Sequence, residues 1–251
     1  MGRGRCYIGT SGWSYAHWAG GRFYPQGLKA GQWLAFYATQ FNTVEINASF
    51  YRLPKPEYVA RWRDTAPAGF QFAVKLWRRI THDKRLADCA GELDGFFATA
   101  AELGSRRGPV LVQLPPAQRK DLPRLDEFLA AFKRVAGRRR WRVAIEFRHS
   151  EWLCPQTREL LDRHGAALCL SDLPRCPVIQ PNDAPFVYLR RHGPAGGYRG
   201  CYTAEQIAAD AAQVRSWLAD GRDVCAYYNN DVGGHAVDNA RELRQAVEAG
   251  G

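Results

Sequence analysis

Residues 42–47 have the sequence NTVEIN, in which polar and apolar side chains alternate from Thr43 to Asn47. The alternation predicts a β-strand, because side chains two apart lie on the same face of a strand. An amphipathic stretch follows at 56–65, and a second β-rich run follows at 70–75. A strand, a helix and another strand in succession form a unit with parallel strands. This part of the chain therefore predicts a β/α repeat.

The same pattern extends along the whole chain in both directions. We expect strands at 5–10, 42–47, 70–75, 109–114, 142–148, 166–171, 185–191 and 223–229, and helices at 29–40, 56–65, 92–104, 122–136, 155–164, 203–219 and 236–248. The connection at about 171–185 is the exception, because its four prolines remove amide donors and disfavour a helix. The pattern predicts an α/β fold, a single (β/α)8 TIM barrel with one crossover that lacks a regular helix.

The length of the chain and the lack of a linker sequence favour a single domain that spans residues 1–251. The chain has 251 residues, a length that fits one large barrel or two small domains. No Gly/Ser-rich linker or change in composition divides it. A doubly wound open sheet is the alternative fold, but the first turn, TSGWSY at 10–15, lacks a Gly-x-Gly-x-x-Gly or phosphate-loop pattern.

The chain carries a positive charge, with 35 Lys and Arg against 25 Asp and Glu and a formal net charge of +10. This excess favours a polyanionic partner, of which DNA or RNA is the commonest, and part of it lies in Arg138, Arg139, Arg140 and Arg142. A solvated basic surface is the alternative interpretation. Seven scattered cysteines without a Cys-x-x-Cys pair predict reduced thiols, and no run of 18 apolar residues occurs, so we expect a cytoplasmic protein that does not bind membranes.

Polar residues gather toward the predicted carboxyl ends of several strands, where a fully buried parallel strand would be apolar. The alternation places these residues on one face of their strands: Glu45 and Asn47, Lys75, Glu146 and Arg148, Arg190 and His192, and Asn229. Barrel enzymes build their sites at this end. The alternative is a salt-bridge network without a ligand, in which Glu45, Glu146 and Asp172 neutralise Lys75, Arg148 and Arg190.

The motifs resemble those of the YecE-like family, also called domain of unknown function 72, over nearly the whole chain. The resemblance rests on GTSGWSY at 9–15, FYP at 23–25, FNTVEIN at 41–47, SFY at 49–51, TH at 81–82, RL at 85–86, QLPP at 113–116, EFRH at 146–149, Arg190, HG at 192–193, YNND at 228–231 and NA at 239–240. It implies a TIM barrel and no particular activity. The exit from the third strand, KLWRRI at 75–80, departs from the family pattern, which more often has a small or proline-containing turn after the lysine.

The leading hypothesis is a protein that binds or hydrolyses a phosphate-containing ligand, such as nucleic acid, at the carboxyl face of the barrel. Glu45 and Glu146 are the candidate general acid/base pair, since burial can hold one protonated while the other stays ionised. Lys75 and Asp172 complete the candidate catalytic set. The candidate substrate-binding residues supply cations, hydrogen-bond donors and aromatic rings: Trp13, Tyr15, Asn47, Tyr51, His82, Arg85, Gln113, Arg148, Arg190, His192, Asn229 and Asp231.

Two other classes of function stay open. A carbohydrate-active hydrolase or isomerase would use the same carboxylates and stack sugars on the aromatic rings, although phosphodiester cleavage fits the charge better than glycoside cleavage. A non-catalytic barrel would retain a small anion. We expect no cofactor and assign no metal ligand; a divalent metal is a weaker alternative, because the sequence lacks a local ligand spacing such as His-x-x-x-His and the nearby cations would repel it. The oligomeric state is left open.

Overall fold

The structure is a computed structural model that describes residues 2–137 and 141–250. Arg138, Arg139 and Arg140, part of the predicted basic segment, lie outside the described residues. The chain divides into two compact units. Unit 1 comprises Met1–Glu45, Leu170–Ile179 and Pro185–Gly251, and unit 2 comprises Ile46–Cys169 and Gln180–Ala184.

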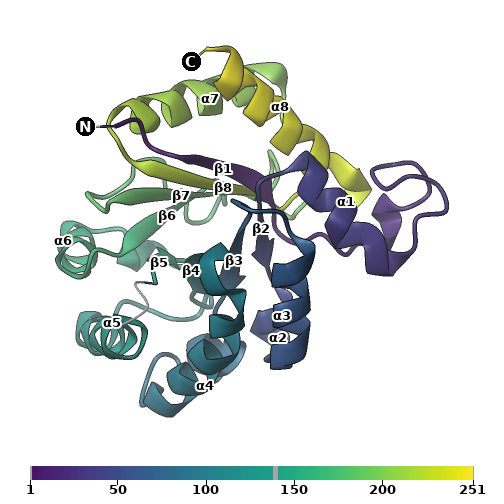
Figure 1. Cartoon of the computed structure of the whole chain (residues 1–251). Coiled ribbons are helices and arrows are strands. Elements are labelled where there is room, and N and C mark those ends of the chain that lie inside the picture. Colours follow the sequence, from purple (N-terminus) through teal and green to yellow (C-terminus); the bar gives the residue numbers. More distant parts are fainter. Residues whose placement is uncertain (1, 138–140, 251) are drawn as a thin grey trace. The chain divides into compact units, whose positions relative to one another are not determined.

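Unit 1 contains the first and last strands of the chain. Its main elements are β1 (Cys6–Thr10), α1 (Trp33–Gln40), most of β2 (Thr43–Ile46), β7 (Phe186–Arg191), α7 (Ala204–Ala219), β8 (Asp223–Tyr228) and α8 (His235–Ala249). Strand β8 pairs in parallel with β1 on one side and with β7 on the other, and a parallel bridge from Ser11 to Glu45 joins β1 to β2. Helices α7 and α8 cover one face of β1 and β8 (Figure 1).

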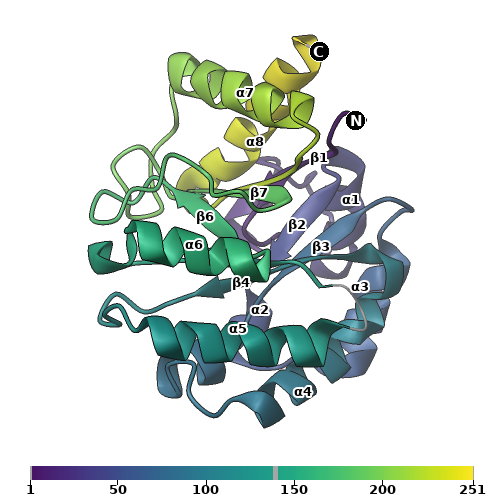
Figure 2. The same ribbon diagram turned by 90° about the vertical axis from the view of Figure 1, so that its left-hand side faces the viewer.

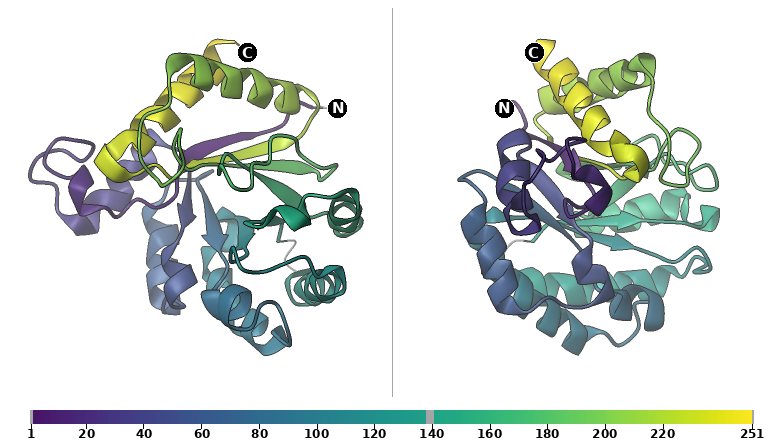
Figure 3. Two further views of the ribbon diagram at one scale, coloured as in Figure 1. Left: turned by 180° about the vertical axis from the view of Figure 1, so that it is seen from behind. Right: turned by 90° about the vertical axis from the view of Figure 1, so that its right-hand side faces the viewer.

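Residues 11–32 form an irregular excursion between β1 and α1. It contains two short 3-10 helices, η1 (Ala16–Trp18) and η2 (Ala30–Gln32). Figure 3 shows the excursion in purple beside the yellow start of α8, where the short helix η7 (Val232–Gly234) precedes that helix. Trp18 and Tyr24 have no exposed surface, so aromatic packing fixes this segment without a regular helix.

Unit 2 contains the middle of the chain. Its elements are α2 (Ala48–Tyr51), α3 (Pro56–Thr65), β3 (Gln71–Lys75), η3 (Arg79–Asp83), α4 (Ala90–Ala100), η4 (Ala101–Arg106), β4 (Arg107–Gln113), α5 (Leu122–Ala136), β5 (Val143–Glu146), η6 (Ser150–Trp152), α6 (Pro155–His164) and the start of β6 (Ala167–Ser171). The ladders β3–β4, β4–β5 and β5–β6 are all parallel. Helices α4, α5 and α6 follow one another along one side of these strands (Figure 2).

Local sequence explains the helix boundaries well in α5. The Asp121 side chain accepts a hydrogen bond from the Arg124 backbone N–H at 3.1 Å, which caps the first turn. Apolar residues then recur at helical spacing, and Leu125, Phe128, Leu129 and Phe132 are all buried. Burial of this stripe against the strands of unit 2 is the main stabilisation of the helix, since propensity alone is weak.

The observed elements confirm the predicted fold class. The described residues form eight strands, with helices between neighbouring strands except between β6 and β7, and the ladders within each unit are parallel, as in a (β/α)8 chain of the TIM-barrel class. The predicted bounds of α3, α5 and α6 match the structure at both ends. Residues 172–185, all of them described, contain no helix, as the four prolines predict. The single-domain assignment stays a prediction.

The sequence pattern missed the short elements. Helix α2, the π-helix η3 and the 3-10 helices η1, η6 and η7 were not expected. The predicted helix at 92–104 begins earlier, at Ala90, and passes into the 3-10 segment η4, where Gly104 adopts a positive φ of 56°. Within the described part of the chain, no helix has both the length and the apolar character needed to cross a bilayer.

Candidate functional site

Three side chains form a buried charged group in unit 1, which we name the Glu45 cluster: Glu45 on β2, and Tyr188 and Arg190 on β7. The Glu45 Oε1 accepts a hydrogen bond from Arg190 Nη2 at 2.8 Å, and its Oε2 accepts one from the Tyr188 hydroxyl at 2.7 Å. Glu45 and Tyr188 have no exposed surface, and Arg190 is 1% exposed. Because Tyr188 and Arg190 are two residues apart, they share one face of β7, as the alternation predicts.

The Glu45 cluster is held together by its own charges. Removing a carboxylate and a guanidinium from water is costly, and short hydrogen bonds to both carboxylate oxygens offset part of that cost. Burial, followed by the neighbouring Glu45 charge, raises the pKa of Tyr188 well above its usual range. The Tyr188 hydroxyl therefore keeps its proton and acts as a hydrogen-bond donor to Glu45 at neutral pH.

Hydroxyl groups surround the Glu45 cluster and fix its strands. Ser11 Oγ lies 3.4 Å from Arg190 Nη2, and the Tyr227 hydroxyl lies 2.9 Å from Thr43 Oγ1. The Tyr37 hydroxyl donates to the Thr43 carbonyl at 3.1 Å and accepts from the Thr10 N–H at 2.9 Å. A side chain from α1 thus replaces part of the backbone ladder between β1 and β2, which keeps Glu45 in place.

Asp172 and His192, both in unit 1, lie at the ends of β6 and β7. The Asp172 carboxylate accepts from the His192 N–H at 2.8 Å and from the Tyr202 hydroxyl, which in turn accepts from the Gly193 N–H at 2.6 Å. His192 has no exposed surface, and its Nδ1 lies 3.2 Å from Asn229 Nδ2. The candidate catalytic residue Asp172 therefore anchors backbone and a tyrosine in this structure.

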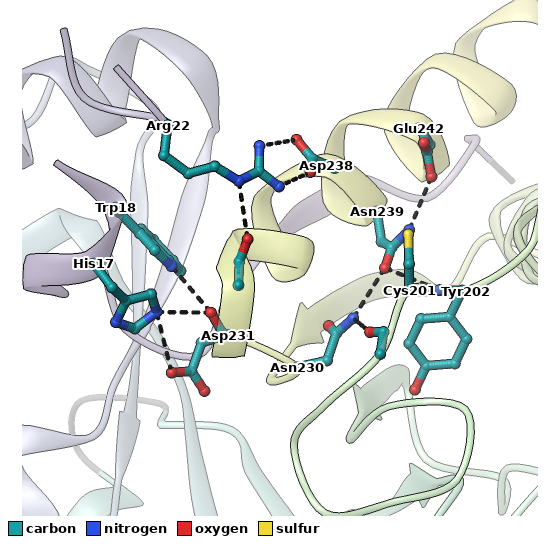
Figure 4. Close-up of polar contacts among 12 residues, drawn as sticks. His17, Trp18, Arg22, Cys201, Tyr202, Asn230, Asp231, Asp238, Asn239 and Glu242 are labelled. Atoms are coloured by element: carbon teal, nitrogen blue, oxygen red, sulfur yellow. Dashed lines mark hydrogen bonds and ion pairs between the residues drawn. The ribbon is translucent and has the colours of Figure 1, made fainter. Parts of the chain in front are cut away.

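Asp231 joins the N-terminal excursion of unit 1 to the region after β8 (Figure 4). Its carbonyl oxygen accepts from Trp18 Nε1 at 3.3 Å and lies 2.7 Å from His17 Nε2. Burial raises the pKa of the Asp231 carboxyl. Nearby, Arg22 forms a two-point contact with Asp238 at the start of α8 (Figure 4). Asp231 therefore has a structural role: its carbonyl oxygen links the excursion at residues 11–32 to the segment after β8.

Trp13 and Tyr15, two more predicted ligand-binding residues, lie in the same excursion and are half-buried. The Tyr15 hydroxyl donates to the Ser11 carbonyl at 2.6 Å, and the Tyr24 hydroxyl donates to the Trp13 carbonyl. Tyr15 also packs against Trp18 with ring centroids 4.7 Å apart. Both residues therefore contribute to the packing of the segment that follows β1.

A second charged group lies in unit 2, and we name it the Lys75 cluster: Lys75, His82, Glu146 and Arg148, with Phe50. Arg148 Nη2 lies 2.6 Å from Glu146 Oε1; the glutamate has no exposed surface and the arginine side chain is 11% exposed. Lys75 Nζ lies 4.1 Å from the centre of the Phe50 ring, and this ring packs edge-on against His82 at 5.0 Å. Lys75, Arg148 and His82 therefore share this region with the Glu146 carboxylate.

The pKa of His82 reflects its burial and the charges around it. Burial is the largest influence, followed by the charges of Lys75 and Arg78, and together with Arg148 they lower the pKa of His82 to about 4, although Asp83 opposes them. His82 is therefore neutral at pH 7. Its Nδ1 lies 2.8 Å from the Thr81 hydroxyl, which orients the ring.

The remaining predicted residues of unit 2 occupy the segments that follow its strands. Asn47 precedes α2, and its buried Oδ1 has no hydrogen-bond partner among the residues that the structure describes. Gln113 pairs in register with Glu146 on the neighbouring strand. Arg85 is exposed and has a positive φ of 49°, and Tyr51 is 71% exposed. The segment KLWRRI at 75–80, which departs from the family pattern, runs into the π-helix η3, and η3 contains His82.

The structure thus gathers the predicted residues into separate groups. Unit 1 brings Glu45 to Arg190, and Asp172 to His192 and Asn229; unit 2 brings Lys75, His82, Glu146 and Arg148 together. The acid/base pairing of Glu45 with Glu146 stays a prediction, since the two residues belong to different units. Among residues 2–137 and 141–250, no group of three or more His, Cys, Asp or Glu side chains has the arrangement of a metal site.

Sequence reasoning missed several members of these groups. Tyr188 was overlooked, although its position two residues before Arg190 puts it on the same face. Tyr202 lies outside the predicted strands, and no spacing rule points to its partner. Their roles depend on contacts between segments far apart in the chain.

Comparison with known proteins identifies the family. A family model described as "Protein of unknown function DUF72" matches residues 7–251. The chain belongs to the DUF72 family. The Escherichia coli K12 protein named UPF0759 protein YecE is 33% identical over 147 residues, which cover 58% of this chain and 49% of that protein, so the match spans about half the relative's length. The Bacillus subtilis UPF0759 protein YunF is 24% identical over 281 aligned positions, with 96% and 94% coverage.

Solved structures of DUF72 proteins share this fold. A crystal structure of a DUF72 family protein from Thermotoga maritima superposes with a TM-score of 0.83 at 27% identity, covering 97% of this chain and 99% of that one. A DUF72 family protein from Enterococcus faecalis gives a TM-score of 0.79 at 21% identity, with 99% of each chain covered. The family resemblance and the TIM-barrel class are thereby confirmed. The names of these DUF72 proteins assign no activity.

Proposed function

We propose that this DUF72 protein binds a phosphate-bearing ligand through Lys75, His82 and Arg148 of the Lys75 cluster. The observation that carries the proposal is the gathering of these side chains: Lys75 Nζ lies 4.1 Å from the centre of the Phe50 ring, which packs against His82 at 5.0 Å. Burial first, and then the charges of Lys75, Arg78 and Arg148, lower the pKa of His82. Like charges that lie close together in a partly buried place repel one another, and a bound anion would relieve that repulsion.

The chemistry of the cluster suits phosphate. The lysine ammonium supplies a compact charge, and the arginine guanidinium offers planar donors that match phosphate oxygens. Glu146 offsets one of the two cations and orients Arg148 through their 2.6 Å contact. His82 adds another donor when it is protonated.

Single-stranded nucleic acid is the phosphate-bearing ligand that we propose. Tyr51 is 71% exposed and packs edge-on against Phe50 at 5.1 Å, so its ring is available to stack on a base. Arg78, Arg79 and Arg85 are exposed in the segment after β3, and the whole chain has a formal net charge of +10. Aromatic faces among cations are typical of surfaces that bind single strands. Where binding leads to turnover, phosphodiester hydrolysis is the proposed reaction, with Glu146 as acid or base.

Binding to a single-stranded oligonucleotide is expected to fall steeply with salt, because each neutralised phosphate releases counterions. Replacing Arg148 with alanine removes a charge-assisted hydrogen bond worth about 1.5–3 kcal/mol, or roughly 10- to 100-fold in affinity, and lowers the salt slope. Fluorescence anisotropy at several salt concentrations measures both effects. Arg61→Ala, an exposed arginine of α3, is the matched control for loss of one charge and is expected to change affinity by less than about twofold.

No detectable binding of DNA or RNA by the wild-type protein at low salt would refute the nucleic-acid proposal. Equal losses in Arg148→Ala and Arg61→Ala would refute the assignment of the site, because they would show a diffuse effect of net charge. Inorganic phosphate serves as a second probe: binding of phosphate without binding of oligonucleotides would limit the ligand to a small anion.

Binding is also expected to strengthen as the pH falls from about 6.5 toward about 4. The pKa of His82 is about 4 in the free protein, below the ordinary histidine value, so a bound phosphodiester that raises it makes the protein take up a proton in this window. Phosphodiesters do not titrate there. Calorimetry in buffers of different ionisation enthalpy measures the uptake, and His82→Asn should abolish it. Proton uptake that persists in His82→Asn would assign the linkage to another group.

A further inference from the structure

The connection between β7 and α7 in unit 1, residues 192–203, contains no regular helix or strand. Four of its residues are glycines with positive φ: Gly193 at 100°, Gly196 at 73°, Gly197 at 75° and Gly200 at 82°. Tyr198, between them, has a φ of 65°, which a residue with a side chain adopts only at a cost. The path of this connection therefore depends on backbone freedom that glycine supplies.

The connection folds back over the end of its own strand. The Tyr198 N–H donates to the His192 carbonyl at 2.8 Å, and the two rings pack edge-on with centroids 5.5 Å apart. His192 has no exposed surface, whereas Tyr198 is 40% exposed. His192 stands two residues beyond Arg190, so it lies on the face of β7 that meets Glu45. Tyr198 therefore covers the outer end of that face.

The base and the tip of the connection are held in different ways. At the base, the Gly200 carbonyl accepts from Asn230 Nδ2 at 2.8 Å, and the Tyr202 N–H donates to Asn239 Oδ1 at 3.2 Å (Figure 4). Asn230 and Asn239 have no exposed surface, and they also bond to each other at 2.9 Å. The base is thus tied to buried amides that follow β8 and lie within α8.

The tip, residues 194–199, bonds back to the start of the connection itself. The Gly196 N–H donates to the Gly193 carbonyl at 2.8 Å, in addition to the bond from Tyr198 to His192. All tip residues except Gly196 are exposed. A segment whose residues are mostly exposed and that buries little apolar surface opens at a lower free energy than the whole fold.

We infer that residues 194–199 form a lid that closes over His192 and opens about Gly193 and Gly200, while Tyr202 stays fixed to its partners. The lid controls access to the face of β7 that carries His192 and Arg190. This inference goes beyond the proposed function, because it concerns unit 1 and does not depend on a ligand at the Lys75 cluster.

Chemical modification of His192 by diethyl pyrocarbonate, followed by mass spectrometry, tests the lid. The reagent acylates a neutral imidazole nitrogen only when it reaches the ring. In the wild-type protein we expect slow modification of His192 at a rate that changes little with urea below the unfolding transition, because opening of a lid exposes little surface. We expect Tyr198→Ala to raise the rate about tenfold or more, and Tyr198→Phe, which keeps the ring, to retain the wild-type rate.

The exposed His17 serves as an internal standard for the reagent in every sample. A modification rate for His192 that rises steeply with urea, in parallel with global unfolding, would overturn the inference. It would show that His192 becomes accessible only when the whole protein unfolds. Equal rates in Tyr198→Ala and the wild-type protein would overturn it as well. Oligonucleotide affinity is expected to be unchanged in Tyr198→Ala, so failure of the lid and failure of the proposed function are distinguishable.

Discussion

Replacing Arg190 with alanine is expected to lower the free energy of unfolding by about 3–5 kcal/mol, because it leaves the buried Glu45 carboxylate without its cation. Glu45 has no exposed surface, and Arg190 supplies its 2.8 Å partner. Tyr188 continues to donate to Glu45, but a neutral hydroxyl does not compensate a buried charge. Such a loss is a large fraction of the total stability of an ordinary domain, about 5–15 kcal/mol.

Urea denaturation at pH 7 measures this effect. Arg119→Ala is the matched control, since Arg119 is exposed and pairs at 2.9 Å with the exposed Glu151, and its loss should cost no more than about 0.5 kcal/mol. Adding Glu45→Gln to Arg190→Ala removes the uncompensated charge, so we expect the double variant to regain a large part of the stability. A loss below about 1 kcal/mol in Arg190→Ala would show that water reaches Glu45.

Substituting alanine for Gly9 is expected to cost about 3 kcal/mol or more. Gly9 lies in β1, and a Cβ at this position would stand 2.1 Å from the Thr43 carbonyl oxygen and 2.9 Å from the Tyr37 hydroxyl. The first of these atoms is backbone of β2, so β1 and β2 must separate to admit a methyl group. The separation would disturb the hydrogen bonds that Tyr37 makes to both strands. Overpacking of this kind costs about 1–3 kcal/mol and occasionally more.

Thermal denaturation of Gly9→Ala and Gly95→Ala makes a matched comparison. Gly95 lies in the middle of α4, where a Cβ would meet no atom within 4 Å. Alanine is the better helix former, so Gly95→Ala is expected to stabilise the protein by about 0.5–1 kcal/mol. Similar melting temperatures for the two variants would contradict the close approach of β2 to Gly9.

Much of the fold follows from local signals in the sequence. Helices α3 and α6 begin with Pro56 and Pro155, and proline is a common first residue of a helix. Helix α6 ends before Gly165, which adopts a left-handed φ of 64°, a common way for a helix to end. Both signals act within a few residues. Helix α2 and the π-helix η3 could not be predicted in the same way. The α2 residue Ser49 donates to the Lys75 carbonyl at 2.7 Å, a contact between segments that no local pattern reveals.

The candidate site was predictable to a lesser extent. Alternation shows which residues share a face, so Glu45 and Arg190 were correctly expected to be close to other charges. It does not show which donor reaches which carboxylate oxygen, because that depends on the register between strands. Tyr188 donates to Glu45 although 143 positions of sequence separate them. The side chain that donates to Asp172 is Tyr202, whereas the salt-bridge alternative paired Asp172 with lysine or arginine.

The discontinuity of unit 1 has a consequence for biosynthesis. The β1–β8 ladder joins Cys6 to Val224 and Thr10 to Tyr228, whereas unit 2 is assembled almost entirely from one continuous stretch of the chain. During translation, residues 46–169 emerge together and can begin to pack while the partner of β1 has not yet been made. The first strand therefore keeps an unpaired edge until residues 223–228 have left the ribosome, and an unpaired strand edge is a place where aggregation can begin.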